Sequence, residues 1–191
     1  MPYQSPSIDQ SLCVFCGSAG GNHSRYMKLA AQTGHEIAAQ GYRLVYGGGM
    51  LGLMGATAKA AYDAGGDVLG IIPNFLKAGA NICEDIPHDI VPDMHTRKKR
   101  MYEASSAFIA LPGGIGTLEE AIEIISWMRL DLHKKPIIFL DDDEYWLPMI
   151  ALIDHTIKTG FSPDGIKEHI FHATEAKEAI DIARRHIEGA G

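Results

Sequence analysis

The chain has 191 residues, a formal net charge of −7 at pH 7, 46% hydrophobic residues and 21% charged residues. This length and composition are typical of one soluble globular domain, which we expect over residues 1–191. The acidic balance argues against a general nucleic-acid binder, which usually carries a basic face, and no apolar run approaches the roughly 20 residues that span a bilayer. Residues 1–10 are polar and carry no export signal pattern, so we expect a disordered lead-in and a cytoplasmic protein.

Apolar runs and amphipathic stretches alternate along the chain. The apolar runs predict strands at 11–16, 42–46, 67–72, 107–111 and 136–140, with weaker strands near 89–91 and 170. The amphipathic stretches predict helices at 24–40, 51–64, 94–105, 118–128, 145–159 and 174–188, and the expected caps are Ser24, Thr117 and Thr174.

This alternation predicts an α/β fold. Short apolar strands without a period of two suit a mostly parallel sheet that is covered by helices on both faces. We therefore expect a three-layer, Rossmann-like sheet of about five to seven strands. Ligands of such sheets bind at the carboxyl ends of the strands, near the point where the strand order reverses. Glycine turns follow three of the predicted strands, at residues 17–21, 47–49 and 113–116.

Cysteine usage favours a reduced interior. The three cysteines are Cys13, Cys16 and Cys83, and an odd count without an export signal argues against a disulfide framework. The spacing of Cys13 and Cys16 could belong to a redox site or to half of a metal site. Because the pair lies inside an apolar strand and no second pair follows at zinc spacing, two buried thiols acting as small core residues are favoured.

The third glycine turn is the strongest functional signal. It lies between a buried strand and an amphipathic helix, and it consists of Gly113, Gly114, Ile115, Gly116 and Thr117. Glycines let the backbone turn tightly and leave room for a ligand, and the free amides at the start of the following helix can bind a phosphate. Two acids, Glu119 and Glu120, follow at once. This combination indicates a phosphorylated ligand with chemistry at its other end.

The second glycine turn, Gly47-Gly48-Gly49, resembles a dinucleotide fingerprint only superficially. Gly47, Gly49 and Gly52 have the G-x-G-x-x-G spacing, but they follow the second strand. The acid at the expected distance, Asp67, begins a strand instead of ending one, so bound NAD is disfavoured. The alternative is that these glycines only allow tight turns and close packing, which fits Gly52 better than three glycines in a row.

Four cations follow one another at residues 97–100 of this acidic chain. A helix turns by about 100° per residue, so four neighbours cannot share one face. A solvated helix surface explains Lys99 and Arg100. Arg97 or Lys98 could instead reach the glycine turns, and the planar guanidinium of arginine binds phosphate or carboxylate with two hydrogen bonds.

Glu119 and Glu120 allow two interpretations. The segment 117–120 matches a capping box with Glu120 at its third helical position, and acids are favourable in the first turn of any helix. Capping does not explain why a glycine phosphate turn comes directly before these acids. The residues alone therefore favour a structural and a catalytic role about equally.

Four segments resemble the signatures of the LOG family, the cytokinin riboside 5′-monophosphate phosphoribohydrolases, whose bacterial members were often labelled lysine decarboxylases. In chain order they are Cys16-Gly17-Ser18, 46–55 (YGGGMLGLMG), 94–98 (MHTRK) and 112–120 (PGGIGTLEE). The resemblance implies a dimeric Rossmann-like fold that removes the base from nucleoside 5′-monophosphates. By the matched motifs, Arg97 and Glu120 are the catalytic pair. The positions implied to bind substrate are Gly113 to Thr117, Glu119, Lys98, Gly47, Gly48, Gly49, Ser18, Met94 and Glu84.

The chemistry of that reaction suits these residues. Breaking an N-glycosidic bond builds positive charge on the ribose, which a nearby carboxylate stabilises while it activates a water. A remote grip on the phosphate fixes the ribose against the acid. We therefore expect Glu120 in the charge-stabilising role and Arg97 orienting it or contacting the substrate. The expected substrate is AMP or an N6-modified adenine nucleotide, and no metal or other cofactor is required.

Other interpretations stay open at this point. The same fold could carry or sense a nucleotide or a molybdenum cofactor without turnover. Lysine decarboxylation normally needs a pyridoxal-phosphate lysine in recognisable surroundings, and no segment marks one. Asp141-Asp142-Asp143 could hold Mg²⁺, although a turn that caps the following helix is favoured.

Overall fold

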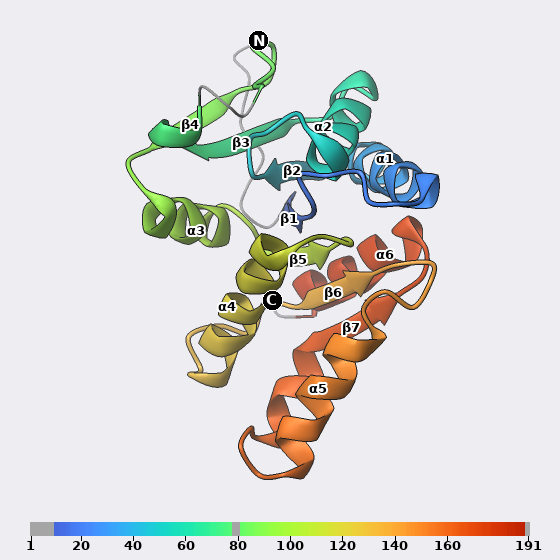
Figure 1. Ribbon diagram of the computed structural model, residues 1–191, viewed down its shortest axis with the longest axis vertical. Helices are drawn as coiled ribbons and strands as arrows, with labels where there is room; N and C mark the ends of the chain where they lie inside the picture. The colour runs from blue at the N-terminus through green and yellow to red at the C-terminus, as the bar shows by residue number, and fades with distance from the viewer. Residues whose placement is uncertain (1–9, 78–80, 190–191) are drawn as a thin grey trace.

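The computed structural model describes residues 10–77 and 81–189, and its centre is a seven-stranded sheet (Figure 1). The strands are β1 (Ser11–Phe15), β2 (Arg43–Tyr46), β3 (Val68–Pro73), β4 (His88–Val91), β5 (Ala107–Ala110), β6 (Ile137–Leu140) and β7 (Ile170–Ala173). Their order in the sheet is β4-β3-β2-β1-β5-β6-β7, and every neighbouring pair is parallel. The prediction of a Rossmann-like parallel sheet is confirmed.

Six α-helices cover the two faces of this sheet. They are α1 (Ser24–Ala39), α2 (Gly52–Asp63), α3 (Met94–Glu103), α4 (Ile115–Arg129), α5 (Leu147–Lys158) and α6 (Ala176–Glu188), and two short 3-10 helices, η2 (Asn74–Leu76) and η3 (Asp164–His169), lie in the connections. Helices α1, α2 and α6 share one apolar core with the sheet, and α3, α4 and α5 share the other. None of the helices in the described ranges is long and apolar enough to cross a membrane.

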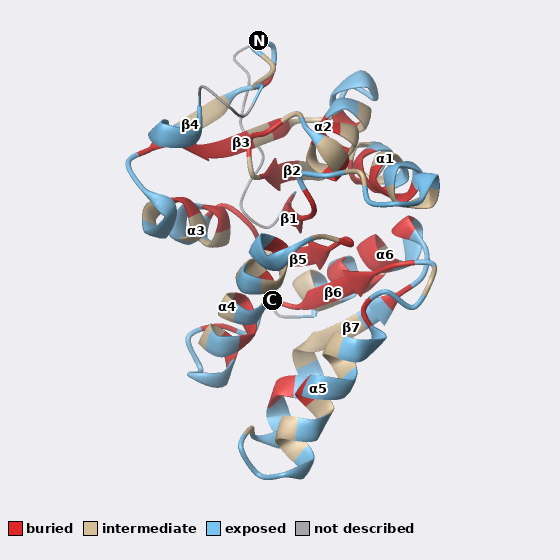
Figure 2. Ribbon diagram, in the orientation of Figure 1, coloured by how far each residue is buried: buried red, intermediate tan, exposed pale blue. Residues whose placement is uncertain are grey.

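Alternating side chains on the strands divide the two cores. Leu12 and Val14 of β1 belong to the core with α1, whereas Cys13 and Phe15 belong to the core with α3 and α4. Figure 2 shows the resulting pattern, with the inner strands buried between helices whose outer surfaces are exposed, whereas the edge strands β4 and β7 are only partly buried. Strands buried on both faces explain why the sequence shows continuous apolar runs instead of an alternation.

The strand order reverses beside β1. The chain builds outward through β2, β3 and β4, and then returns to place β5 on the other side of β1. The loops that follow β1 and β5 therefore lead in opposite directions and leave a crevice between them. The two loops are joined where the Gly17 amide donates to the Pro112 carbonyl at 3.1 Å.

Several predicted caps are wrong by one to three residues. His23, not Ser24, is the N-cap of α1, and its ring nitrogen accepts from the Arg25 amide. Glu175, not Thr174, is the N-cap of α6, because the backbone becomes helical only at Ala176. The predicted lead-in, residues 1–10, lies outside the described residues except for Gln10.

The cysteine prediction is confirmed for the first two thiols. Cys13 and Cys16 are buried and free, and Cys83 is free and half-buried. Burial raises the pKa of the Cys13 and Cys16 thiols well above the ordinary value, so both are neutral at physiological pH. Neutral thiols in an apolar setting behave as small core side chains.

Candidate active site

A cleft of about 630 Å³ lies at the carboxyl ends of the central strands. Its walls come from the loops after β1 and β2, from η2, and from the first turns of α3 and α4. Of the residues predicted from sequence, those that line it are Ser18, Gly47, Gly49, Met94, Arg97, Gly114, Ile115, Gly116, Thr117, Glu119 and Glu120. Segments far apart in sequence therefore meet at one place.

The predicted catalytic pair forms a buried ion pair in this cleft. Nη1 of Arg97 lies 2.6 Å from Oε1 of Glu120, and only 9% and 11% of the two side chains are exposed. Nε of Arg97 donates to the Ile71 carbonyl at the end of β3, at 3.1 Å. The guanidinium is thus held by the sheet on one side and by α4 on the other, which fixes the direction of the Glu120 carboxylate.

Burial changes the acidity of Glu120. Desolvation raises the pKa of its carboxyl group, and the Arg97 charge and hydrogen bond oppose part of this rise. A carboxylate taken out of water in this way interacts more strongly with positive charge that develops beside it. A raised pKa also brings the group closer to the range where it can exchange a proton with a water or a leaving group.

The glycines after β2 make room for Arg97. A Cβ atom on Gly47 would lie 2.3 Å from Nη2 of Arg97, a distance that no side chain could occupy. Gly48 has a φ of +81°, and its carbonyl oxygen lies 3.1 Å from Nε2 of His88. The tight-turn explanation therefore fits Gly48, whereas Gly47 is required by the position of the guanidinium.

The first turn of α4 offers free amides to the cleft. Among the described residues, no protein acceptor bonds the amides of Ile115, Gly116 or Thr117. The N-terminus of α2 differs, because its Leu53 and Met54 amides donate to the Gly17 carbonyl at 3.0 and 3.4 Å. The two helix starts face the same region, but α4 is the one left open for an anion.

The prediction that Thr117 caps this helix is wrong. The N-cap is Gly114 in an extended conformation, and α4 starts at Ile115, so Thr117 already lies within the helix. The capping-box interpretation of Glu120 is wrong for the same reason, since its carboxylate binds Arg97 instead of a backbone amide. A glycine cap leaves the amides of the first turn without the side-chain partner that a Thr cap would supply.

Comparisons with known proteins identify the family. A family model described as "Possible lysine decarboxylase" matches residues 54–183. A probable cytokinin riboside 5′-monophosphate phosphoribohydrolase of Oryza sativa subsp. japonica is 42% identical over 176 residues, which cover 92% of this chain and 83% of the relative. A cytokinin riboside 5′-monophosphate phosphoribohydrolase of Rhodococcoides fascians is 41% identical over 186 residues, or 95% of this chain and 92% of the relative. The chain belongs to the LOG family.

Solved structures share the fold of this LOG-family chain. The molybdenum cofactor binding protein from Rippkaea orientalis superposes with a TM-score of 0.69 at 22% identity, and the match covers 93% of this chain and 95% of that one. At this level of identity the likeness extends to the fold alone.

Four of the positions predicted to bind substrate lie outside the lining of the cleft. Gly48 packs behind it against Ile72, and Glu84 lies in the exposed connection before β4. Gly113 lies directly under the turn, where a Cβ atom would come 2.1 Å from Oγ1 of Thr117. Lys98 points to carboxylates of α4.

Lys98 is engaged by two carboxylates. Its Nζ lies 2.5 Å from Oε1 of Glu119 and 2.9 Å from Oε1 of Glu123. Lys99 and Arg100 pair on the outer surface with Glu103 and Asp89, as the solvated-face interpretation predicts. Of the four consecutive cations, Arg97 is the one that lines the cleft.

Sequence reasoning missed an apolar rim around the cleft. The exposed large apolar side chains that line it are Leu51, Phe75, Leu76, Met94 and Ile115, and of these only Met94 and Ile115 were predicted. Large apolar side chains left in water beside a glycine turn are a signal that could have marked the others.

The acidic turn after β6 is structural. Asp141 is fully buried, and its carboxylate accepts from the amides of Asp143, Tyr145 and Trp146 at 3.1 to 3.2 Å. The prediction of a turn before the following helix is confirmed, but the prediction that this acidic segment caps the helix is wrong, because the N-cap of α5 is Trp146 and no side chain of the described residues bonds its first amides. In the described part of the chain, no cluster of three or more His, Cys, Asp or Glu side chains could hold a metal ion.

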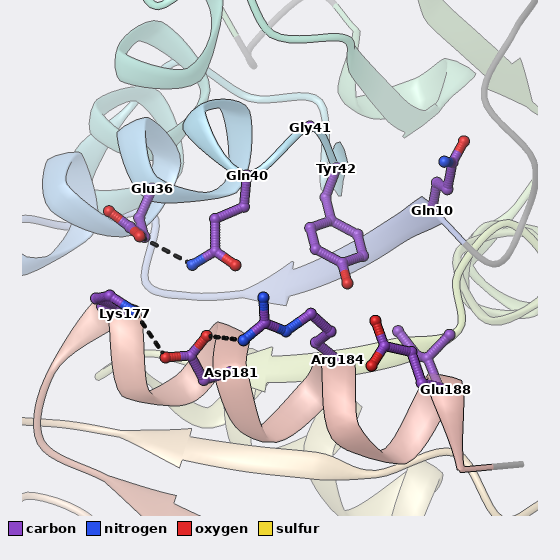
Figure 3. A pocket seen from close by; sticks show the side chains of 10 residues that line it. Gln10, Glu36, Gln40, Gly41, Tyr42, Lys177, Asp181, Arg184 and Glu188 are labelled. Carbon is purple, nitrogen blue, oxygen red and sulfur yellow. Dashed lines mark hydrogen bonds and ion pairs between the residues drawn. The ribbon is translucent and has the colours of Figure 1, made fainter.

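A second hollow, of about 550 Å³, lies at the opposite end of the sheet between α1 and α6 (Figure 3). Three of its charged side chains are paired, since Asp181 binds both Lys177 and Arg184 at 2.8 Å. The ring of Tyr42 points into it from the start of β2. None of the predicted site residues lines this hollow.

Proposed function

We propose that this chain hydrolyses the N-glycosidic bond of nucleoside 5′-monophosphates, AMP or N6-modified adenine nucleotides, to the free base and ribose 5-phosphate. The relatives at 41–42% identity are named as enzymes of this type. The observation that carries the proposal is the buried pair of Arg97 and Glu120 in the same cleft as the open N-terminus of α4.

In this proposal the phosphate binds to the amides of residues 114–117 at the positive end of α4. The ribose then lies over Glu120, and the base extends toward the apolar rim. As the bond from C1′ to the base breaks, the base leaves with the bonding electrons and the ribose becomes positively charged. Glu120 stabilises that charge and takes a proton from the attacking water, whose oxygen bonds to C1′, while the departing base gains a proton.

Arg97 supports this step by holding Glu120. Arg97 makes two hydrogen bonds, to the Ile71 carbonyl and to Glu120, and these hold the Glu120 carboxylate in one orientation. The carboxylate therefore does not need to change rotamer before the reaction. Glu119 is less suited to the central role, because 51% of its side chain is exposed and its carboxylate binds Lys98. We assign Glu119 to the edge of the substrate site.

The apolar rim of the cleft is suited to contact the base of the substrate. Phe75, Leu76 and Met94 offer an apolar surface that suits an apolar substituent on an adenine N6 atom.

We further propose that the protein is a cytoplasmic homodimer. The exposed apolar side chains Leu51 and Ile115 beside the cleft support a second copy covering this region.

The main rival is a carrier or sensor that binds a nucleotide or a molybdenum cofactor without turnover. A buried acid beside a phosphate site repels the ligand, so a protein that only binds has no use for it. Lysine decarboxylation is the weakest candidate. Lys98, the lysine of the matched motif, is bound by two carboxylates and does not line the cleft.

The test is to incubate the pure protein with AMP and with an N6-modified AMP, and to measure free base by chromatography. We expect release of the base together with an equal amount of ribose 5-phosphate. Tight binding of both nucleotides without release would favour the carrier. Release of carbon dioxide from lysine would favour the decarboxylase.

A further inference from the structure

Tyr145 connects the acidic turn to the glycine turn of the cleft. Its hydroxyl group donates to the Gly113 carbonyl oxygen at 2.5 Å. The two residues are 32 positions apart, and they come from the segments that follow β6 and β5. Both line a cavity of about 230 Å³ that adjoins the cleft and shares Gly17, Ser18 and Gly114 with it.

This hydrogen bond fixes the orientation of the peptide unit that contains the Gly114 amide. The Gly113 carbonyl and the Gly114 N–H belong to one planar trans peptide unit, so the two groups point in opposite directions. Fixing the carbonyl on the Tyr145 side therefore directs the Gly114 N–H away from Tyr145. Because Gly114 is the N-cap of α4 and lines the cleft, this amide joins those of the first helical turn.

The peptide unit needs such a restraint. It lies between two glycines, which have the widest range of backbone conformations, and a Cβ atom on Gly114 would meet nothing within 4 Å. Packing around Gly114 therefore does little to resist a rotation of this unit. A rotation would point a carbonyl oxygen at the place where the phosphate binds, and would turn an attractive contact into a repulsive one.

Tyr145 itself is held firmly. The buried carboxylate of Asp141 accepts from the Tyr145 amide at 3.1 Å, and Nε2 of His172 lies 3.0 Å from the other carboxylate oxygen. The Tyr145 ring packs edge-on against Trp146, with ring centres 5.0 Å apart, and against Tyr26 at 6.1 Å. The hydroxyl group is therefore presented by an ordered turn.

We propose that Tyr145 is a positioning residue for the substrate phosphate, and that its hydroxyl group holds the peptide between Gly113 and Gly114 so that the Gly114 amide faces the cleft. The ligand class follows from that geometry, namely a phosphate monoester whose oxygen accepts from this amide. The proposal rests on the proposed function for the identity of the ligand as a nucleoside 5′-monophosphate.

The test compares ligands with and without a phosphate. Tyr145→Phe removes the hydroxyl group and keeps the ring, and Tyr42→Phe makes the same change in the hollow at the other end of the sheet (Figure 3). Dissociation constants for AMP, ribose 5-phosphate and adenosine are measured by calorimetry on the Glu120→Gln protein, whose slow turnover preserves AMP, and on the same protein carrying either tyrosine change. Thermal melting checks that each protein is folded.

For Tyr145→Phe we expect AMP and ribose 5-phosphate to bind roughly fivefold more weakly, as the loss of one hydrogen bond implies. Adenosine should bind as it does to the protein with both tyrosines, and the Tyr42→Phe change should leave the binding of all three ligands normal. Equal weakening of adenosine and AMP, or no weakening of either phosphate ligand, would overturn the proposal. Turnover of AMP by the wild type is scored separately, so that failure of the proposed function is distinguished from failure of the positioning role.

Discussion

Replacing Gly47 by alanine should inactivate the site without removing any group that takes part in the chemistry. The added Cβ atom would lie 2.3 Å from Nη2 of Arg97, and ordinary van der Waals contact starts near 3.4 Å. The guanidinium must therefore move by about 1.1 Å, or the β2 loop must move by a similar amount. The backbone at Gly47 has no positive φ, so alanine meets no conformational penalty there.

A displacement of this size matters because the pair with Glu120 is short. Moving Nη1 from 2.6 Å by about an ångström takes it out of hydrogen-bonding range and frees the carboxylate to rotate. Misplacement of a catalytic group by about 1 Å can cost about 10²-fold in rate, which corresponds to about 2.7 kcal/mol in the activation barrier. We expect kcat/KM for AMP to fall by that factor.

The same substitution should change stability less. Removing one partner of a buried ion pair costs about 3–5 kcal/mol, but here both partners remain and can relax toward each other. We expect a loss of about 1–2 kcal/mol, which lowers the melting temperature by roughly 2–8 °C in a chain of this size. The variant should therefore stay folded at assay temperature.

The assay measures base release from AMP by chromatography alongside thermal melting. Gly165→Ala is the matched control, since a Cβ atom there meets nothing within 4 Å and the residue lies in η3, outside the lining of the cleft. The control should keep normal kcat/KM. A Gly47→Ala protein that is folded and fully active would refute the idea that the fixed guanidinium is needed.

Three further predictions concern the same site. Glu120→Gln should lower kcat by about 10³-fold while AMP still binds, because the amide keeps the shape but not the charge; normal turnover would move the role to another acid. Arg97→Ala should also abolish activity, and unchanged kinetics would reduce Arg97 to a structural cation. Since burial raises the pKa of Glu120, kcat should fall on the acidic side at a higher pH than the ordinary glutamate value of about 4.3 predicts. The active form is the ionised Glu120 carboxylate, which is lost as the pH drops through the raised pKa, so the acidic limb should vanish from the residual rate of Glu120→Gln.

Local patterns were sufficient to predict the fold. Continuous apolar runs such as 107–111 and 136–140 mark strands buried on both faces, and alternation with helices leaves a parallel sheet as the natural arrangement. Helix starts were harder to predict. The N-cap of α4 is Gly114, an extended glycine without a side chain that could bond the first amides. The loop before it is joined to the β1 loop by the hydrogen bond from Gly17 to Pro112, a contact that the local sequence does not reveal.

Many of the residues that line the candidate site could be named from the sequence, but their contacts could not. The glycine turn and the two acids can be recognised along the chain, but the choice between Glu119 and Glu120 depends on which one faces Arg97 across 23 residues. The roles of Gly47 and Tyr145 depend on atoms from other strands, namely the guanidinium of Arg97 and the carbonyl of Gly113. No local pattern contains such pairings.

The most direct measurement is a crystal structure of the Glu120→Gln variant with bound AMP, in which slow turnover preserves the ligand. We predict that the phosphate oxygens accept hydrogen bonds from the amides of residues 114–117 and that C1′ of the ribose faces the side chain at position 120. An AMP molecule whose phosphate lies elsewhere, or whose ribose faces away from position 120, would contradict the account.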